Sequence, residues 1–417
     1  MKTVLLLAYQ YPPALSSAAK RSGCMAKYLP HYGWRPVVIS RLWTPENGRY
    51  DPNLVRDLPP EALVAAIPDG NRRAYSGAFA RIRMFVHPST NPHRWTQSVL
   101  KVLPRIVNQY KPDAIWATCL PHATLYIADY ISRKMGIPWI ADFRDVLGQF
   151  GSDERLHRRL LINPRVVPLE SRLIRSASAV TTVSEGLARI LQGRHQREVD
   201  IIPNGFDPDD YAQTTWDKHD RFSIRYFGSL YTSRDPSTLF AAIDSLERNR
   251  LIKLEDIRLQ FYGSNPAYLA SFVRDYCCRQ VVKCHPVIPH REAIHLQQNS
   301  SVLLVLSGAG GKGILTGKVF EYLASQRPIL CAPGDGDCID RLLRETNAGV
   351  SCSTINEVAT QLLKWYREWK AIGTIRYEGR LDAIMKYSRE EQAGQLADLL
   401  NILTRGSAEN DSGKNNI

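Results

Sequence analysis

Short apolar runs separated by amphipathic stretches recur along almost the whole chain. The first forty residues show the repeating unit: an apolar run at 4–9, a stretch with helical spacing at 20–32, and a second apolar run at 34–40. Continuous apolar runs of this length are typical of strands that are buried on both faces of a parallel sheet. The pattern predicts a βαβ unit and, continued along the chain, a doubly wound α/β fold.

This pattern stops once and then restarts. The last apolar run of the first series lies at 199–202, a polar stretch follows, and a new series begins at 222–227. The chain length of 417 residues also favours two domains. Near the end, Ser388 and Glu391 have the spacing of a capping box that begins a final helix. The predicted organisation is an N-terminal domain at 1–208, a linker at 209–220, a C-terminal domain at 221–387, a helix at 388–404 and a disordered polar tail at 405–417.

The composition is that of a globular protein, with 44% hydrophobic and 23% charged residues. No apolar run approaches the roughly 18 residues of a membrane-spanning helix. The apolar start at 4–8 is too short for a secretory signal and is soon followed by Pro12-Pro13. The eight cysteines form no CxxC pair, so we expect reduced thiols and no metal site. We therefore expect a cytoplasmic protein.

The net charge of +13 points to an anionic partner. Basic and aromatic residues are mixed at 72–87, and such a segment is a candidate for contact with the inner face of an anionic membrane. The alternative is a helix that packs on its own domain with solvated arginines. The remaining arginines are spread over several segments, so we expect no nucleic-acid groove.

Polar side chains follow two of the predicted strands in the first half of the chain. His122 comes after the apolar run at 114–118, and Asp142, Arg144 and Asp145 follow the run that begins at Pro138. The carboxyl ends of parallel strands are where open α/β sheets bind ligands. A helix cap or a surface ion pair is the structural alternative for each cluster. We take His122, Arg144 and Asp145 as candidate catalytic residues.

Glycine-bearing loops follow the predicted strands of the second half. They occur at Gly228-Ser229, at Gly263-Ser264 and at 308–313, and loops of this kind can present backbone N–H groups to phosphate. The last loop leads into a helix that carries Lys318 and Glu321. A helix start with a lysine suits a phosphate group, and a glutamate one turn later can accept hydrogen bonds from sugar hydroxyls.

Several short motifs occur in order along nearly the whole chain. They are Tyr11-Pro12-Pro13 with Arg21, Pro121-His122, Asp142-Phe143-Arg144-Asp145, Ser184-Glu185, the run from Ile202 to Asp207, and Tyr226-Phe227-Gly228-Ser229 with Arg234. In this order they resemble the GT-B glycosyltransferases, specifically the retaining family-4 group of bacterial polysaccharide and glycan biosynthesis. The resemblance implies two Rossmann-like domains facing across a cleft and a C-terminal helix that crosses back to the first domain.

The resemblance also implies a reaction and a set of site residues. A UDP- or GDP-sugar would donate its sugar, with retention and without a further cofactor, to a glycan, a lipid-linked acceptor or a small molecule. Arg234 and Lys318 would hold the diphosphate and Glu321 the ribose. Gly313 stands where the family has the first glutamate of its Glu-x7-Glu signature, so either the backbone of 308–313 would contact the donor sugar or the sugar itself would differ. The expected donor-site residues are Gly228, Ser229, Arg234, Gly263, Gly313, Thr316, Lys318 and Glu321, with His122, Arg144 and Asp145 on the acceptor side.

Two other classes of function remain open. A sugar-nucleotide epimerase or a phosphorylase can be built on the same fold. A non-catalytic basic binding protein is the other alternative, and the glycine at position 313 is its main support.

Overall fold

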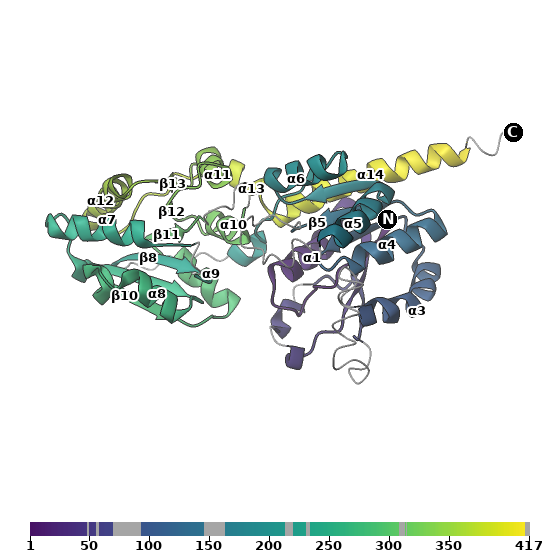
Figure 1. Ribbon diagram of the computed structural model, residues 1–417, viewed down its shortest axis with the longest axis horizontal. Coiled ribbons are helices and arrows are strands. Elements are labelled where there is room, and N and C mark those ends of the chain that lie inside the picture. Colours follow the sequence, from purple (N-terminus) through teal and green to yellow (C-terminus); the bar gives the residue numbers. More distant parts are fainter. Residues whose placement is uncertain are drawn as a thin grey trace. The chain divides into compact units, whose positions relative to one another are not determined.

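The computed structural model divides the chain into two compact units, each built on one parallel sheet (Figure 1). Unit 1 comprises Met1–Pro203 and Arg389–Ile417, and unit 2 comprises Asn204–Ser388. The predicted α/β class with two parallel-sheet domains is thereby confirmed. The structure describes residues 1–47, 50–55, 58–69, 93–145, 163–212, 220–230, 234–307, 313 and 315–412. The candidate membrane segment at 72–87, most of the predicted linker and residues 308–312 and 413–417 lie outside these ranges.

Unit 1 contains a seven-stranded sheet in the order β3-β2-β1-β4-β5-β6-β7, with every described pair of neighbours parallel. The apolar runs of the sequence form its central strands, as predicted, because a strand covered by helices on both faces exposes neither row of side chains. The strands are β1 (Lys2–Leu7), β2 (Trp34–Arg41), β3 (Leu63–Ile67), β4 (Ala114–Cys119), β5 (Trp139–Phe143), β6 (Ala179–Thr182) and β7 (Asp200–Ile201).

Two layers of helices cover the sheet of unit 1. Alternate residues of β1 enter different cores: Leu5 and Leu7 pack in one, and Val4 and Leu6 in the other. The first core is closed by α3 (His93–Tyr110), α4 (Ala123–Met135), α5 (Asn163–Ser176) and α6 (Glu185–His195). The second core is closed by α1 (Ser17–Tyr28) and α14 (Arg389–Ser412).

Helix α14 brings the chain back to unit 1 after unit 2 is complete, as predicted for the final helix. Its residues Leu396 and Leu400 are fully buried in the same core as Met25 of α1. The helix continues to Ser412, beyond residue 404 where the sequence pattern places its end. Within the described ranges, no helix combines the length and the apolar content needed to cross a membrane.

Unit 2 contains a six-stranded parallel sheet in the order β10-β9-β8-β11-β12-β13. Its strands are β8 (Phe222–Phe227), β9 (Ile257–Tyr262), β10 (Val282–His285), β11 (Val302–Val305), β12 (Ile329–Cys331) and β13 (Gly349–Ser351). One core contains residues of α7 (Ser237–Arg248), α8 (Pro266–Val273) and α12 (Ile355–Ile372). The other contains residues of α9 (His290–Gln298), α10 (Gly317–Ala324), α11 (Cys338–Thr346) and α13 (Leu381–Met385).

Candidate functional site

Each sheet has one point where the strand order reverses, and ligands of open α/β sheets bind beside such points. In unit 1 the reversal lies between β1 and β4, and in unit 2 it lies between β8 and β11. The loop that follows β8 begins at Gly228, and the chain that follows β11 leads into α10. The predicted donor residues therefore surround the switch point of unit 2.

Lys318 and Gly228 fit against each other at this point. The Lys318 Nζ lies 5.4 Å from the centroid of the Tyr226 ring, at the end of β8. A Cβ at Gly228 would overlap this Nζ, and the φ of +144° at Gly228 is one that other residues rarely adopt. Glycine at position 228 therefore leaves room for the ammonium group of Lys318.

Burial and a neighbouring cation both disfavour the charged form of Lys318. Burial and the neighbouring Arg234 lower the pKa of Lys318 to about 8, and Glu321 opposes them only in part. A cation with a lowered pKa beside a second cation is stabilised when an anion binds between them. Arg234 Nη1 lies 3.5 Å from the Tyr226 hydroxyl, which itself donates to the Ser229 carbonyl over 3.1 Å. The arrangement suits a phosphate or diphosphate group.

Hydrogen bonds hold the loops of this edge in place. The Gly228 N–H donates to the Tyr262 carbonyl over 2.7 Å, and the Ser264 hydroxyl donates to the Gly228 carbonyl over 2.7 Å. The Phe227 N–H donates to the hydroxyl of Tyr322 on α10 over 2.9 Å. The loops after β8 and β9 and helix α10 are thus fixed to one another before any ligand binds.

The remaining predicted donor residues lie on the same loops and helix. Gly263 follows β9 with a φ of +73°, and Gly313 is buried with a φ of +78°. Thr316 is the N-cap of α10 and makes no side-chain cap hydrogen bond. Glu321 lies one turn after Lys318 and is partly buried, and its charge acts on the hydroxyls of Tyr211 and Tyr322.

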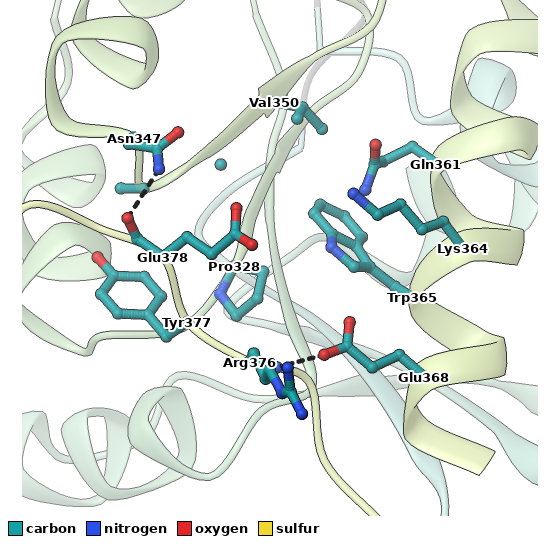
Figure 2. Close-up of a pocket in the computed structure, with 12 residues that line it drawn as sticks. Pro328, Asn347, Val350, Gln361, Lys364, Trp365, Glu368, Arg376, Tyr377 and Glu378 are labelled. Carbon is teal, nitrogen blue, oxygen red and sulfur yellow. Dashed lines mark hydrogen bonds between the residues drawn. The ribbon is translucent and has the colours of Figure 1, made fainter. Parts of the chain in front are cut away.

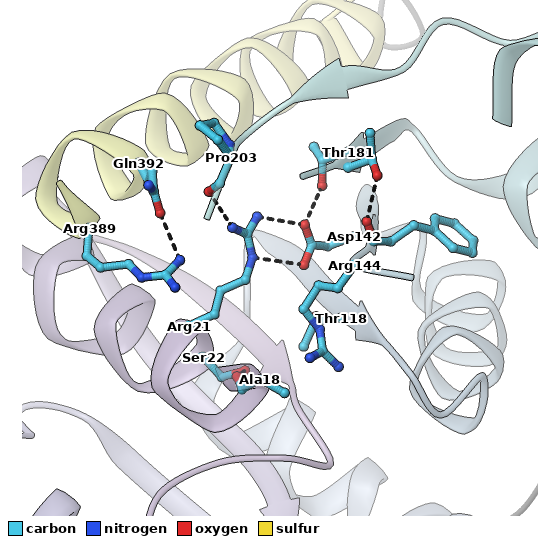
Figure 3. Close-up of polar contacts among 12 residues, drawn as sticks. Ala18, Arg21, Ser22, Thr118, Asp142, Arg144, Thr181, Pro203, Arg389 and Gln392 are labelled. Carbon is cyan, nitrogen blue, oxygen red and sulfur yellow. Dashed lines mark hydrogen bonds and ion pairs between the residues drawn. The ribbon is translucent and has the colours of Figure 1, made fainter. Parts of the chain in front are cut away.

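In unit 1 the predicted cluster at the carboxyl end of β5 divides into a buried part, which Figure 3 shows, and an exposed part. Asp142 is fully buried and pairs with the buried Arg21 of α1 through two hydrogen bonds of 2.9 and 3.3 Å. Arg21 also donates to the Pro203 carbonyl over 2.8 Å, and the Thr181 hydroxyl donates to Asp142 over 2.9 Å. This ion pair and its hydrogen bonds connect α1, β5, β6 and Pro203, so its role is structural.

Arg144 forms hydrogen bonds with the end of β4 and with the segment that follows it. Its guanidinium donates to Thr118 Oγ1 over 3.0 Å and to the Leu120 carbonyl over 3.2 Å. The side chain of Asp145 is exposed, and its charge acts on Arg144. Arg144 therefore contacts the segment that leads to His122.

His122 lies in a buried cluster that the sequence did not reveal. It precedes α4, is 7% exposed, and its Nε2 lies 3.3 Å from Oε2 of Glu170 on α5. The other oxygen of Glu170 lies 3.0 Å from His195 Nε2 and 3.5 Å from Arg194 Nη1, both on α6. Glu170 precedes the core residue Leu173 by one helical turn. A carboxylate on the apolar face of a helix was therefore the sequence signal that could have indicated this buried cluster.

A further pocket lies elsewhere in unit 2 (Figure 2). Pro328 and Asn347 on its wall precede β12 and β13, so it opens at the amino ends of these strands. Trp365 of α12 forms another wall, and the pocket encloses about 110 Å³. Sites for drug-sized ligands take roughly 300–1,000 Å³, so this pocket is too small for a nucleotide sugar. Among the described residues, no group of three or more His, Cys, Asp or Glu side chains could hold a metal ion.

Comparisons with known proteins agree with this architecture. Residues 18–205 match the family model of the glycosyl transferase 4-like domain. Sucrose-phosphate synthase from Thermosynechococcus elongatus superposes with a TM-score of 0.65 at 15% identity, over 97% of this chain and 100% of that one. The Anabaena protein HepE, in complex with UDP and glucose, gives a TM-score of 0.62 at 13% identity, over 97% and 100%.

The same fold also occurs in a protein that is described as having another activity. A putative UDP-N-acetylglucosamine 2-epimerase from Listeria monocytogenes gives a TM-score of 0.54 at 11% identity, over 95% of each chain. Among curated protein sequences, none matches this chain. Identities this low establish the fold alone. This chain thus has the GT-B fold of two parallel-sheet α/β units, and its residues 18–205 match the model of the glycosyl transferase 4-like domain.

Proposed function

We propose that the protein transfers a hexosyl-type sugar from a nucleoside-diphosphate sugar to an acceptor, with retention of anomeric configuration. One observation carries this proposal: the ammonium group of Lys318 is seated against Gly228 beside Arg234, with a pKa lowered to about 8. Two prearranged cations at a switch point are what a departing diphosphate requires, because negative charge develops on it as the sugar bond breaks. UDP is the preferred nucleotide, since HepE is described in complex with UDP.

The other residues of unit 2 would complete the donor site. Glu321 would accept hydrogen bonds from the ribose hydroxyls, since it lies one turn beyond Lys318 on α10. Gly228, Ser229, Gly263 and Thr316 would offer backbone groups and the Thr316 hydroxyl to the donor. Gly313 leaves the donor sugar without the carboxylate that the related family has at this place, so the transferred sugar would be recognised by other groups.

Unit 1 would supply the acceptor-side residues. His122 and Arg144 lie near the carboxyl end of β4, and the exposed Asp145 follows β5. The acceptor would be a glycan, a lipid-linked sugar or a small molecule. A glycan or lipid-linked acceptor would place the protein in polysaccharide or glycolipid biosynthesis.

Binding of nucleotide sugars tests the proposal. We expect UDP or a UDP-sugar to raise the melting temperature of the protein, and Lys318→Ala or Glu321→Ala to remove most of the increase. Lys364→Ala, an exposed lysine of α12, is the matched control and should leave the increase unchanged. If UDP-, GDP-, TDP- and ADP-sugars all leave the melting temperature unchanged, both the transferase and the epimerase proposals fail. Exchange at C2 of a UDP-sugar without transfer would instead identify an epimerase, the activity ascribed to the Listeria protein.

We also propose that unit 1 contacts an anionic membrane on the inner face, through a surface that includes exposed cations of α3 and α4; the segment 72–87, for which the sequence suggested this contact, lies outside the described residues. Lys101, Arg105, Arg133 and Lys134 are exposed on these two helices, beside Tyr130, which is 40% exposed. The only acidic residue in the two helix sequences is Asp129, which is buried and pairs with Arg133 over 2.7 Å. Basic side chains with interfacial tyrosines are typical of surfaces that bind anionic lipids.

Sedimentation with vesicles tests this contact. Vesicles with anionic lipid should bind the protein, and binding should fall as salt rises. Reversing Lys101, Arg105, Arg133 and Lys134 to Glu should abolish binding. The control reverses Arg274, Arg279, Lys364 and Arg367, four exposed cations of unit 2, and changes the net charge equally. Equal loss of binding in both variants would show that only the total charge matters and would reject this surface.

A further inference from the structure

We propose that Glu170 is a positioning residue that holds His122 as a fixed imidazolium at the carboxyl end of β4, so that His122 acts through its charge and not as a general base. The inference rests on the proposed function only for the role that the charge of His122 has in the reaction. The arrangement of the two side chains stands on geometry within unit 1. His122 precedes α4, and Glu170 lies on α5, 48 residues later in the chain.

The geometry fixes one nitrogen of the His122 ring. Nε2 lies 3.3 Å from Oε2 of Glu170, and a carboxylate can only accept a hydrogen bond, so Nε2 carries a proton. Both side chains are almost fully buried, with exposed fractions of 7% for His122 and 1% for Glu170. Water cannot replace this contact, and Nε2 therefore has no lone pair to offer a substrate.

The other neighbours of the ring favour the charged form. Burial lowers the pKa of His122, but Cys119 and Glu170 outweigh burial and raise it to about 10. Burial raises the pKa of Glu170, yet its hydrogen bonds with His122 and His195 and the charges of His122 and Arg194 bring it to about 2. Arg144, which donates to the Leu120 carbonyl, is a cation on the side of the β4 segment and acts against the charged form of His122. Both pKa shifts favour an ionised carboxylate on Glu170 and a protonated imidazole on His122.

The position of His122 is unfavourable for a residue that serves stability alone. A helix N-terminus carries a partial positive charge, which disfavours a cation there. Ser, Thr, Asp or Asn would cap α4 without this cost, and the His122 side chain makes no cap hydrogen bond. A buried counter-ion from another helix is needed to keep the imidazolium in place, and Glu170 supplies it.

Glu170 in turn is held by groups on its far side. Its Oε1 lies 3.0 Å from His195 Nε2, whose ring Nδ1 lies 3.0 Å from the Ser171 hydroxyl. Arg194 Nη1 lies 3.5 Å from the same Oε1. The carboxylate is therefore anchored on α6 through one oxygen and directed at His122 through the other. A fixed positive charge at the carboxyl ends of the unit 1 strands would attract a substrate group that carries negative charge.

Nuclear magnetic resonance of the full-length protein with 15N-labelled histidine tests this inference without any substrate. The His122 signals, assigned by their loss in His122→Gln, should show an imidazolium that does not titrate between pH 6 and 9. Glu170→Gln should lower the midpoint of His122 by roughly one to three pH units, towards or into the observed range, because one of the two groups that raise its pKa is lost. Glu390→Gln removes the carboxylate of an exposed pair, 3.0 Å from His31, and should leave the His122 signals unchanged.

A purely structural role predicts different results. If His122 of the wild-type protein titrates near pH 6.5, or if Glu170→Gln leaves its titration unchanged, the inference is wrong. Once donor turnover is measurable, Glu170→Gln should lose kcat progressively as pH rises from 6 to 9, with KM for the donor unchanged, and Glu170→Asp should recover part of the loss. A pH-independent loss that follows the loss of folded protein would show that Glu170 only stabilises unit 1. Failure of nucleotide binding would refute the proposed function but not the charge state of His122.

Discussion

Binding of a nucleoside diphosphate should be coupled to proton uptake by Lys318. In the free protein, burial and Arg234 lower the pKa of Lys318 to about 8. A bound diphosphate places negative charge beside the ammonium group and returns the pKa towards its usual value near 10.4. Binding at a pH between these two values must therefore draw a proton from solution.

The size of the effect follows from the two pKa values. With a free pKa of about 8, about 0.1 proton should be taken up at pH 7, about 0.5 at pH 8 and about 0.9 at pH 9. UDP itself contributes little at pH 8 and above, because a terminal phosphate loses its last proton near pH 6. Affinity should fall as pH rises through this range, since free protein must gain the proton to bind well.

Isothermal titration of UDP in two buffers of different ionisation enthalpy measures the uptake. Lys318→Arg keeps a permanent charge and should bind UDP without the uptake. Lys364→Arg, on the exposed face of α12, is the matched control and should behave as the wild-type protein. Equal uptake in the wild-type protein and in Lys318→Arg, or no uptake at pH 8 and 9, would refute the assignment of Lys318 to the diphosphate.

Three further predictions concern glycine 228 and the buried charges of unit 1. Gly228→Ala should weaken UDP binding at least about tenfold, because its Cβ displaces the ammonium group, whereas Gly136→Ala, also at positive φ but with open space around it, should affect only stability by about 1 kcal/mol. Titration calorimetry and urea unfolding distinguish the two. Asp142→Ala should lower the unfolding free energy by about 3–5 kcal/mol, because the buried Arg21 loses its partner; a loss below about 1 kcal/mol would contradict this. The pKa of Glu170 is lowered to about 2, so its contribution is present above pH 4.5 and is lost as pH falls towards 2. The urea midpoints of wild type and Glu170→Gln should therefore converge as pH falls from 4.5 to 2, and a constant difference would contradict the pairing.

The sheets could be predicted from sequence because their signal is local. The apolar run of β1 identifies a strand that is buried on both faces, and β8 repeats the same signal after the polar stretch. The rule that ligands bind at the carboxyl ends of parallel strands then directs attention to Gly228 and Lys318. The structure adds that the ammonium group of Lys318 occupies the space that a Cβ at Gly228 would need. No spacing in the sequence indicates this contact.

The buried ion pairs could not be predicted, because their partners are far apart in the chain. Arg21 and Asp142 are separated by 121 positions, and only the fold brings them within 2.9 Å. From the sequence, Asp142 was therefore grouped with Arg144 and Asp145 in one polar cluster. Glu170 gave a weaker signal still, as a single carboxylate on the apolar face of α5. The extension of α14 to Ser412 was missed for another reason: an established helix adds residues at little cost, even where the sequence is polar.

Hydrogen–deuterium exchange with and without a UDP-sugar tests most directly where the donor binds. The donor site proposed for unit 2 predicts slower exchange at 226–230 and 315–324 on addition of UDP-glucose. Lys318→Ala should remove this protection, and the pocket beside Trp365 should be unaffected. Protection confined to that pocket, or protection that survives in Lys318→Ala, would contradict the assignment of the donor to the switch point of unit 2.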